Sequence, residues 1–178
     1  KTASEILGLA LTGRDCGQEE RAPMCGVPFH SCDGYIAKLV KAGLKVAICE
    51  QVEDPATAKG IVERKVIKVI TPGTITLPDV LEETKNNFLV CIYKSGLGYG
   101  LAAADVSTGE LYAVSLTGVA AKTDLMNELS KYSPSEILHN SFFMSDKTVL
   151  SFIEHKFKCM TQPRPDMTVD GAAEELKK

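Results

Sequence analysis

The stretch FLVCIYKSGLGYGLAAADVSTGELYAVSL, residues 88–116, decides the fold class of the second half of the chain. It predicts three strands joined by glycine-containing turns, at 88–93, 101–106 and 111–116. Apolar residues at helical spacing then predict helices within 125–132 and 149–157, with a short strand at 136–139 between them. The proline-rich and charged tail from Gln162 shows no complete element. Strands followed by alternating helices and strands indicate an α/β protein.

Residues 1–84 show a second alternation of helix and strand. A turn-rich loop covers 13–28, and a helix runs from an N-cap at Ser31 to a stop at Gly43. Strands are expected at 9–12, 44–49 and 62–71. A polar stretch separates this half from residues 85–178, whose order of elements is that of the beginning of a ribonuclease-H-like layer. The sequence therefore predicts an α/β chain of two small domains, the second of them incomplete.

The composition is that of an ordinary soluble globular protein. Of 178 residues, 44% are hydrophobic and 24% charged, which excludes a disordered chain and a coiled-coil rod. No apolar run approaches the roughly 20 residues of a membrane span, and the segment from Lys1 to Glu5 lacks the apolar core of a signal peptide. We therefore expect a cytoplasmic protein with no membrane partner and with reduced thiols. The missing initial Met is expected of a piece cut from a longer protein.

Net charge alone does not identify a partner. The chain carries 20 Lys and Arg against 23 Asp and Glu, a net charge of −3, so nucleic-acid binding requires a local basic patch. The best candidate runs from Lys59 to Lys68, where four basic residues and one acidic residue, Glu63, give +3. On a regular strand, Arg64 and Lys68 share one face and Lys65 points to the other. Such a row either follows a phosphate backbone or forms a solvated strand face.

The sequence DVSTG at 105–109 admits two interpretations. Ribonuclease-H-like nucleases and actin-like phosphotransferases hold a divalent metal with an Asp on the first strand, a part that Asp105 could play. A two-metal site needs more carboxylates, and the nearby options, Glu110, Glu128 and Asp146, lie in no motif. The segment is also typical of a turn, because Asp and Ser side chains bond to the local backbone, and this interpretation is the favoured one.

The spacing of the residues, or the elements expected around them, argues against a dinucleotide-binding loop and a zinc site. The glycines at 96–100 precede a strand rather than a helix, which favours a hairpin turn over a dinucleotide loop. The cysteines and histidine between 16 and 32 lack the close pairs typical of a zinc site. Cys49 lies in an apolar run and is expected to behave as a small hydrophobic residue.

Several motifs, in the same order along the chain, resemble those of the MutS family of DNA mismatch-recognition proteins. MCGVPFH at 24–30 is similar to the family's M-A-G-[IV]-P-[YF]-H, and VAICEQVEDP at 46–55 to V-A-I-C-E-Q-x-x-D-P. TPGT at 71–74 and DVSTG at 105–109 also match. LTGR at 11–14 resembles L-T-K-R, with Gly in place of Lys.

The resemblance implies a fold and a role for each half. Residues 1–84 correspond to a mixed-sheet mismatch-recognition domain, and residues 85–178 to a ribonuclease-H-like connector domain that is not a nuclease, which favours the turn interpretation of Asp105. The family's ATPase domain, with ATP or ADP and Mg, belongs to the full-length parent. We expect this chain to bind no cofactor or metal and to have no catalytic residues. The family's Phe-x-Glu wedge does not precede the helix that ends at Leu7, so weak DNA binding is expected.

The predicted DNA contacts lie in the first half of the chain. The basic contacts, to phosphate or sugar, are Arg14 and Arg64, followed by the weaker candidates Lys59 and Lys65. The loop residues expected to face DNA are Met24, Gly26 and Pro28. His30 is expected either to contact DNA or to cap the following helix.

The predicted function is therefore recognition of mismatched double-stranded DNA through backbone and minor-groove contacts, with a signal relayed through the connector. The resemblance also implies a MutL-type partner for the connector and a homodimer for the full-length parent, whereas this chain is expected to be monomeric. The alternative functions are a metal-dependent nuclease centred on Asp105 and a module that binds only proteins.

Overall fold

The computed structural model describes residues 1–17, 19–54, 62–77, 81, 85–168 and 171. Contacts divide the chain into two compact units. The first contains the described residues of Lys1–Thr71 together with Leu77, and the second contains Pro72–Thr76 together with the described residues from Leu81 onward. The predicted α/β class with two small domains is confirmed. The predicted boundary after residue 84 stays a prediction, because residues 82–84 lie outside the described part of the chain.

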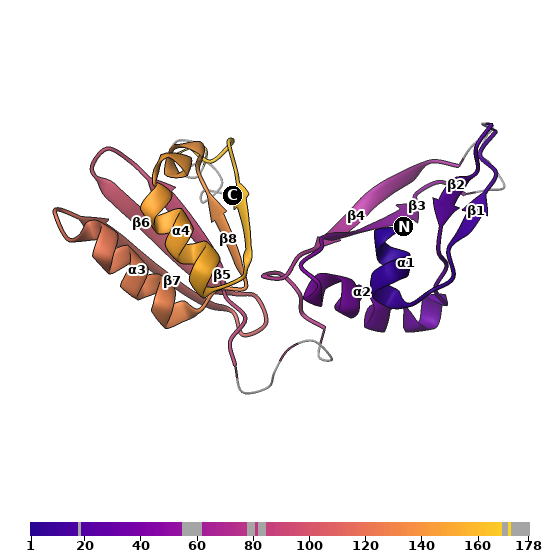
Figure 1. The fold of residues 1–178 in the computed structure, drawn as a ribbon, viewed down its shortest axis with the longest axis horizontal. Helices are drawn as coiled ribbons and strands as arrows, with labels where there is room; N and C mark the ends of the chain where they lie inside the picture. Colours follow the sequence, from indigo (N-terminus) through magenta and orange to yellow (C-terminus); the bar gives the residue numbers. More distant parts are fainter. Residues whose placement is uncertain (18, 55–61, 78–80, 82–84, 169–170, 172–178) are drawn as a thin grey trace. The chain divides into compact units, whose positions relative to one another are not determined.

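The first unit combines short helices with two separate antiparallel strand pairs, β1–β2 and β3–β4 (Figure 1). Its elements are α1 (Thr2–Leu7), β1 (Thr12–Arg14), β2 (Ala22–Met24), the 3-10 helix η1 (Phe29–Ser31), α2 (Cys32–Lys41), β3 (Val46–Gln51) and β4 (Arg64–Ile70). The predicted loop at 13–28 thus contains β2, and the strand expected at 9–12 begins only at Thr12. Strands β1 and β2 have three residues each, which is too short for an alternation of apolar and polar residues to be recognised in the sequence.

Helix α2 buries one apolar face, formed by Ile36, Ala37 and Val40. Ser31 occupies the predicted N-cap position, but its hydroxyl donates to the carbonyl of Pro28 at 3.3 Å instead of capping the helix. Gly43 has φ +80 just beyond the helix end, a conformation that glycine adopts without strain.

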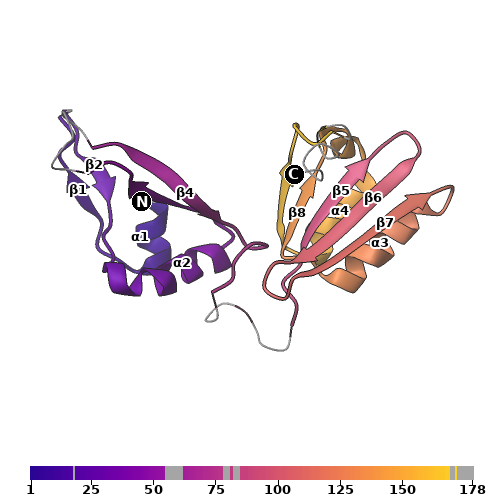
Figure 2. The same cartoon turned by 180° about the vertical axis from the view of Figure 1, so that it is seen from behind.

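The second unit is a five-stranded mixed sheet in the order β7-β6-β5-β8-β9. Its elements are β5 (Leu89–Lys94), β6 (Gly98–Asp105), β7 (Glu110–Thr117), α3 (Ala121–Tyr132), β8 (Glu136–His139), the 3-10 helix η2 (Ser141–Ser145), α4 (Lys147–Lys156) and β9 (Met160–Pro163). Strand β5 pairs antiparallel with β6 and parallel with β8, which pairs in turn with β9. Helices α3 and α4 lie on one face of the sheet (Figures 1 and 2).

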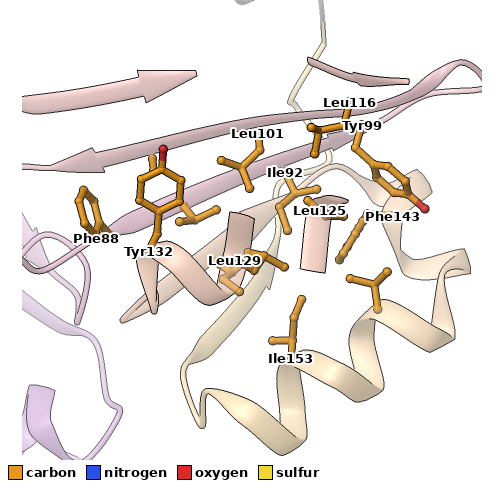
Figure 3. Packing of buried hydrophobic residues seen from close by; sticks show 14 of the residues in the cluster. Phe88, Ile92, Tyr99, Leu101, Leu116, Leu125, Leu129, Tyr132, Phe143 and Ile153 are labelled. Atoms are coloured by element: carbon orange, nitrogen blue, oxygen red, sulfur yellow. The ribbon is translucent and has the colours of Figure 1, made fainter. Parts of the chain in front are cut away.

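The core of the second unit lies between that sheet face and the two helices (Figure 3). Alternate strand residues point into it, so Val90 and Ile92 of β5 are fully buried while their neighbours are partly exposed. Leu125 and Leu129 of α3 meet them and are also fully buried. Burying each such side chain contributes about 1.5–3 kcal/mol relative to leaving it exposed. None of the helices that the structure describes has the length and apolar character needed to cross a membrane.

Leu125→Ala should lower the free energy of unfolding of the second unit by about 2–5 kcal/mol, because the substitution leaves a cavity in a closely packed core. Four of the five tyrosines lie beyond residue 88 and the chain has no Trp, so tyrosine fluorescence during urea unfolding mainly reports this unit. Leu97→Ala, at a site that is 85% exposed, should change stability by no more than about 0.5 kcal/mol. Equal effects of the two substitutions would contradict the packing described.

Candidate nucleic-acid interface

The basic residues at 64–68 lie on β4, and a β-bulge determines which faces they occupy. The β3–β4 register pairs Gln51 with Arg64 and Glu50 with Lys65, then shifts so that Ile48 lies opposite Lys68. Directly opposed residues share a face of the sheet. The bulge, at Ile67, therefore moves Lys68 to the face that carries Lys65. The expectation that Arg64 and Lys68 share a face is wrong, because it assumed a strand with unbroken alternation.

The two faces of this ribbon differ in exposure. Ile70, on the Lys65 face, is 5% exposed and belongs to the core. Val66 and Val69, which the register places on the Arg64 face, are 59% and 50% exposed. Arg64 thus lies at the end of an accessible face with apolar neighbours, a combination that suits contact with the sugars and phosphates of DNA.

Carboxylates contributed by neighbouring segments offset part of the basic run. The ammonium group of Lys65 lies 3.2 Å from a carboxylate oxygen of Glu63, and both side chains are more than half exposed. Glu50 lies opposite Lys65 in the register, and the Glu53 carboxylate accepts a hydrogen bond from the Glu63 amide at 3.2 Å. Arg64 instead lies opposite the uncharged Gln51. The net charge of 59–68 includes Glu63 but not Glu50 and Glu53, because these two residues precede that range and come close to it only through strand pairing and a hydrogen bond.

The β1–β2 pair carries the other predicted contacts. Arg14, which lies opposite Ala22, is exposed, and Met24, which lies opposite Thr12, is 41% exposed. Gly26 and Pro28 are also exposed in the loop after β2. Arg21 is a further exposed arginine that the sequence analysis missed; its Cβ lies 3.0 Å from where a Cβ on Gly13 would be. Arg21 therefore packs across the strand that carries Arg14.

The structure does not bring all of the predicted contacts onto one sheet. Arg14 and Met24 lie on the β1–β2 pair, whereas Arg64 and Lys65 lie on the separate β3–β4 pair. Lys59 lies outside the described residues.

Asp105, the centre of the alternative nuclease site, is a buried turn residue at the end of β6. Its side chain is 1% exposed, and its oxygens accept hydrogen bonds from the Asn87 amide at 2.8 Å, the Ser107 amide at 2.8 Å and the Ser107 hydroxyl at 2.6 Å. Burial alone raises the pKa of a carboxyl, but these bonds and one from the Thr108 amide outweigh burial and lower the pKa of Asp105. The structure agrees with the turn interpretation.

The carboxylates considered as additional metal ligands each have another partner. Glu110 accepts a hydrogen bond from the Asn86 side chain, and Glu128 lies 3.6 Å from the Lys131 ammonium group. Asp146 caps α4 by accepting from the Val149 amide. Within the described part of the chain, no group of three or more His, Cys, Asp or Glu residues is placed to hold a metal ion.

Asp146 lies in a small charged cluster. It pairs with Lys122 at 3.1 Å and with Lys94 at 3.6 Å, and it accepts a hydrogen bond from the hydroxyl of Tyr99. Burial opposes ionisation of Asp146, but the bonds from Tyr99 and Lys122 prevail and lower its pKa. Burial and the same carboxylate raise the pKa of Tyr99 to about 12.

Cys49, which the sequence predicts to behave as a small hydrophobic residue in an apolar run, is exposed. It lies on the outward face of the ribbon, opposite Val66. An apolar run in a two-stranded ribbon does not imply burial, since one of its faces can remain open to solvent.

Each of the two units matches a domain of a known protein family. Residues 1–79 match MutS domain I and residues 87–178 match MutS domain II. The chain belongs to the MutS family. The resemblance predicted from the motifs is therefore confirmed, and the two units of this MutS-family chain correspond to two successive domains of the family.

Its relatives are much longer proteins. The DNA mismatch repair protein MutS of Ruminiclostridium cellulolyticum is 57% identical over 155 residues, covering 87% of this chain and 18% of the relative. The proteins of the same name from Acetivibrio thermocellus and Caldanaerobacter subterraneus are 52% identical over 157 residues and 45% identical over 176 residues. These matches cover 88% and 99% of this chain, and 18% and 20% of the relatives. The chain thus spans about a fifth of their length.

Asp105→Asn should destabilise the second unit at neutral pH by about 1–3 kcal/mol, because an amide nitrogen would replace one acceptor of backbone hydrogen bonds. The folded-state pKa of Asp105 is lowered, so its charged form stabilises the fold above the unfolded-state pKa of about 4, and this contribution is lost as the pH falls through the folded-state value. Urea midpoints measured between neutral and acidic pH should therefore fall less steeply for the variant. Glu154→Gln, at an exposed site on α4, should leave the slope as in the wild type; an unchanged slope for Asp105→Asn would contradict the assignment.

Proposed function

We propose that this MutS-family chain is a module that recognises mismatched double-stranded DNA through phosphate, sugar and minor-groove contacts made by its first unit. The observation that carries the proposal is the exposed Arg64 on the outward face of a bulged ribbon, opposite an uncharged residue, in a unit that matches MutS domain I. The net charge of the chain is −3, so affinity depends on such local contacts.

The two strand pairs supply different kinds of contact. Arg14 and Arg64 are the principal phosphate or sugar contacts, and Lys65 is a weaker one because Glu63 already pairs with it at 3.2 Å. Lys59 stays a candidate. Met24, at the end of β2, and the loop residues Gly26 and Pro28 face the minor groove, where a glycine backbone and apolar side chains approach the sugars closely. Mismatched steps bend at lower cost than paired steps, so DNA deformability contributes to discrimination.

The remaining roles belong to the wider protein. The second unit relays the mismatch signal and meets a MutL-type partner through residues 85–178, in the cytoplasm. The full-length parent is a homodimeric ATPase that binds ATP or ADP with Mg, whereas this chain is monomeric and has no catalytic activity. The hydrogen bonds that occupy the Asp105 oxygens argue against the alternative nuclease. Metal-dependent cleavage by the wild type that is lost in Asp105→Asn would support the nuclease instead.

Arg64→Ala should weaken binding to matched and mismatched duplexes alike, because a phosphate contact carries no sequence information. The slope of log affinity against log salt should decrease by about one unit. Fluorescence anisotropy with labelled duplexes over a salt series measures both quantities. Arg164→Ala is the matched control, because Arg164 pairs with Asp166 in the second unit at 2.9 Å; an Arg64 variant that behaves like this control would refute the contact.

Glu63→Gln should strengthen DNA binding, since it frees Lys65 and removes a negative charge next to the phosphates. Exposed ion pairs are worth little, so the expected gain is about 1.5- to 5-fold at low salt and smaller at high salt. Titration of the same labelled duplex provides the measurement. Glu128→Gln removes a comparable ion pair to Lys131 in the second unit and should have no effect; weaker binding by Glu63→Gln would place the phosphates elsewhere.

A further inference from the structure

Arg14 and Arg21 lie on opposite faces of the ribbon formed by β1 and β2. Arg14 lies opposite Ala22 in the register, one residue beyond Gly13 on β1. Directly opposed residues share a face and successive residues alternate between faces, so Arg14 and Gly13 belong to different faces. Arg21 is on the Gly13 face, because its Cβ, Cδ and Nε atoms lie 3.0, 3.7 and 3.7 Å from where a Cβ of Gly13 would be.

Gly13 provides the space over which the Arg21 side chain lies. Arg21 is diagonal to Gly13 across the strand pair, a position from which a long side chain reaches its neighbour. A Cβ at position 13 would lie 3.0 Å from the Cβ of Arg21, which is fixed directly to the backbone. A larger residue at position 13 therefore displaces Arg21 from β1.

Both arginines are available to an anion. They are exposed, and neither guanidinium group forms an ion pair within the part of the chain that the structure describes. The nearby carboxylates of Asp15, Glu19 and Glu20 lie in the connection between the two strands, at the end of the ribbon far from α1 and α2 (Figure 1). This acidic end repels phosphates, so the opposite end, which carries Met24, is the one that suits a DNA groove.

The thickness of the ribbon determines which duplexes both arginines can reach together. A strand layer with side chains on both faces is about 10 Å thick, whereas the minor groove of regular B-form DNA is about 6 Å wide. A ribbon with one end in this groove can meet the backbones on both sides only where the groove is widened. Bending and unstacking that widen the groove cost least at a mismatched step.

We propose that Arg21 is a specificity-determining residue that contacts one of the two sugar–phosphate backbones bordering a widened minor groove, while Arg14 contacts the other. This inference rests on the proposed DNA-binding function, to which it adds a residue that favours mismatched over matched duplexes. The Arg21 contact forms fully only on a duplex whose groove opens. It differs in this respect from the Arg64 contact, which is expected with either duplex.

Fluorescence anisotropy with two labelled duplexes that differ only in one mismatched pair tests the inference. Arg21→Gln should weaken binding to the mismatched duplex by about three- to tenfold and to the matched duplex by less than about twofold. The slope of log affinity against log salt should decrease by about one unit with the mismatched duplex only. Arg21→Lys, which keeps the charge, should retain most of the preference for the mismatch.

Lys38→Gln is the matched control, because it removes the same charge from an exposed site on α2 in the same unit. It should change neither affinity by more than about twofold. Gly13→Ala is a second variant, which keeps every charge but displaces Arg21 from β1. It should lower the preference for the mismatched duplex in the same direction as Arg21→Gln.

Equal losses on the two duplexes in Arg21→Gln would refute the role of Arg21 in specificity. Affinities that match those of Lys38→Gln would refute the contact itself. In both cases, a wild type that prefers the mismatched duplex leaves the proposed function standing. If the wild type binds neither duplex, or binds both alike, the proposed function fails, and this inference with it.

Discussion

The second unit depends on the pairing of β5 with neighbours on both of its edges. Antiparallel β6 follows it directly, but parallel β8 requires a crossover, which α3 provides. The crossover brings α3 onto the sheet face where Val90 and Ile92 are buried. The side chain of Asn140 extends the β5–β8 edge by bonding both the amide and the carbonyl of Lys94, at 3.0 and 2.8 Å.

Buried carboxylates in the second unit bind backbone amides. Asp105, Glu136 and Asp146 are all buried, and each accepts at least one backbone N–H. Asp105 holds a turn, Glu136 holds the backbone at Gly73, and Asp146 holds the first turn of α4. The first unit is built differently: only four of its described hydrophobic residues are buried, Ile36, Ala37, Val40 and Ile70. Its two-stranded ribbons leave arginine and methionine side chains accessible, as the proposed DNA-binding surface requires.

The sequence predicts the elements that repeat an apolar pattern and misses those that depend on distant partners. The strand predicted at 136–139 agrees with the structure, because a local apolar run between turn signals specifies it. Strand β9 is missed, since Met160–Pro163 is short, shows no repeated apolar pattern and pairs with β8 at the edge of the sheet. The bulge at Ile67 arises from cross-strand register, and the need for glycine at position 73 from close approach to residues far along the chain. The family motifs indicate which loops matter, but cannot give the face on which each arginine lies.

Hydroxyl-radical footprinting with a mismatched duplex tests most directly whether DNA lies on the first unit. Met24 and Met144 are 41% and 51% exposed and belong to different units, so they form an internally matched pair of oxidation probes. Our account predicts that saturating DNA slows oxidation of Met24 and leaves the rate at Met144 unchanged. An unchanged rate at Met24, or protection of Met144 in its place, would contradict it.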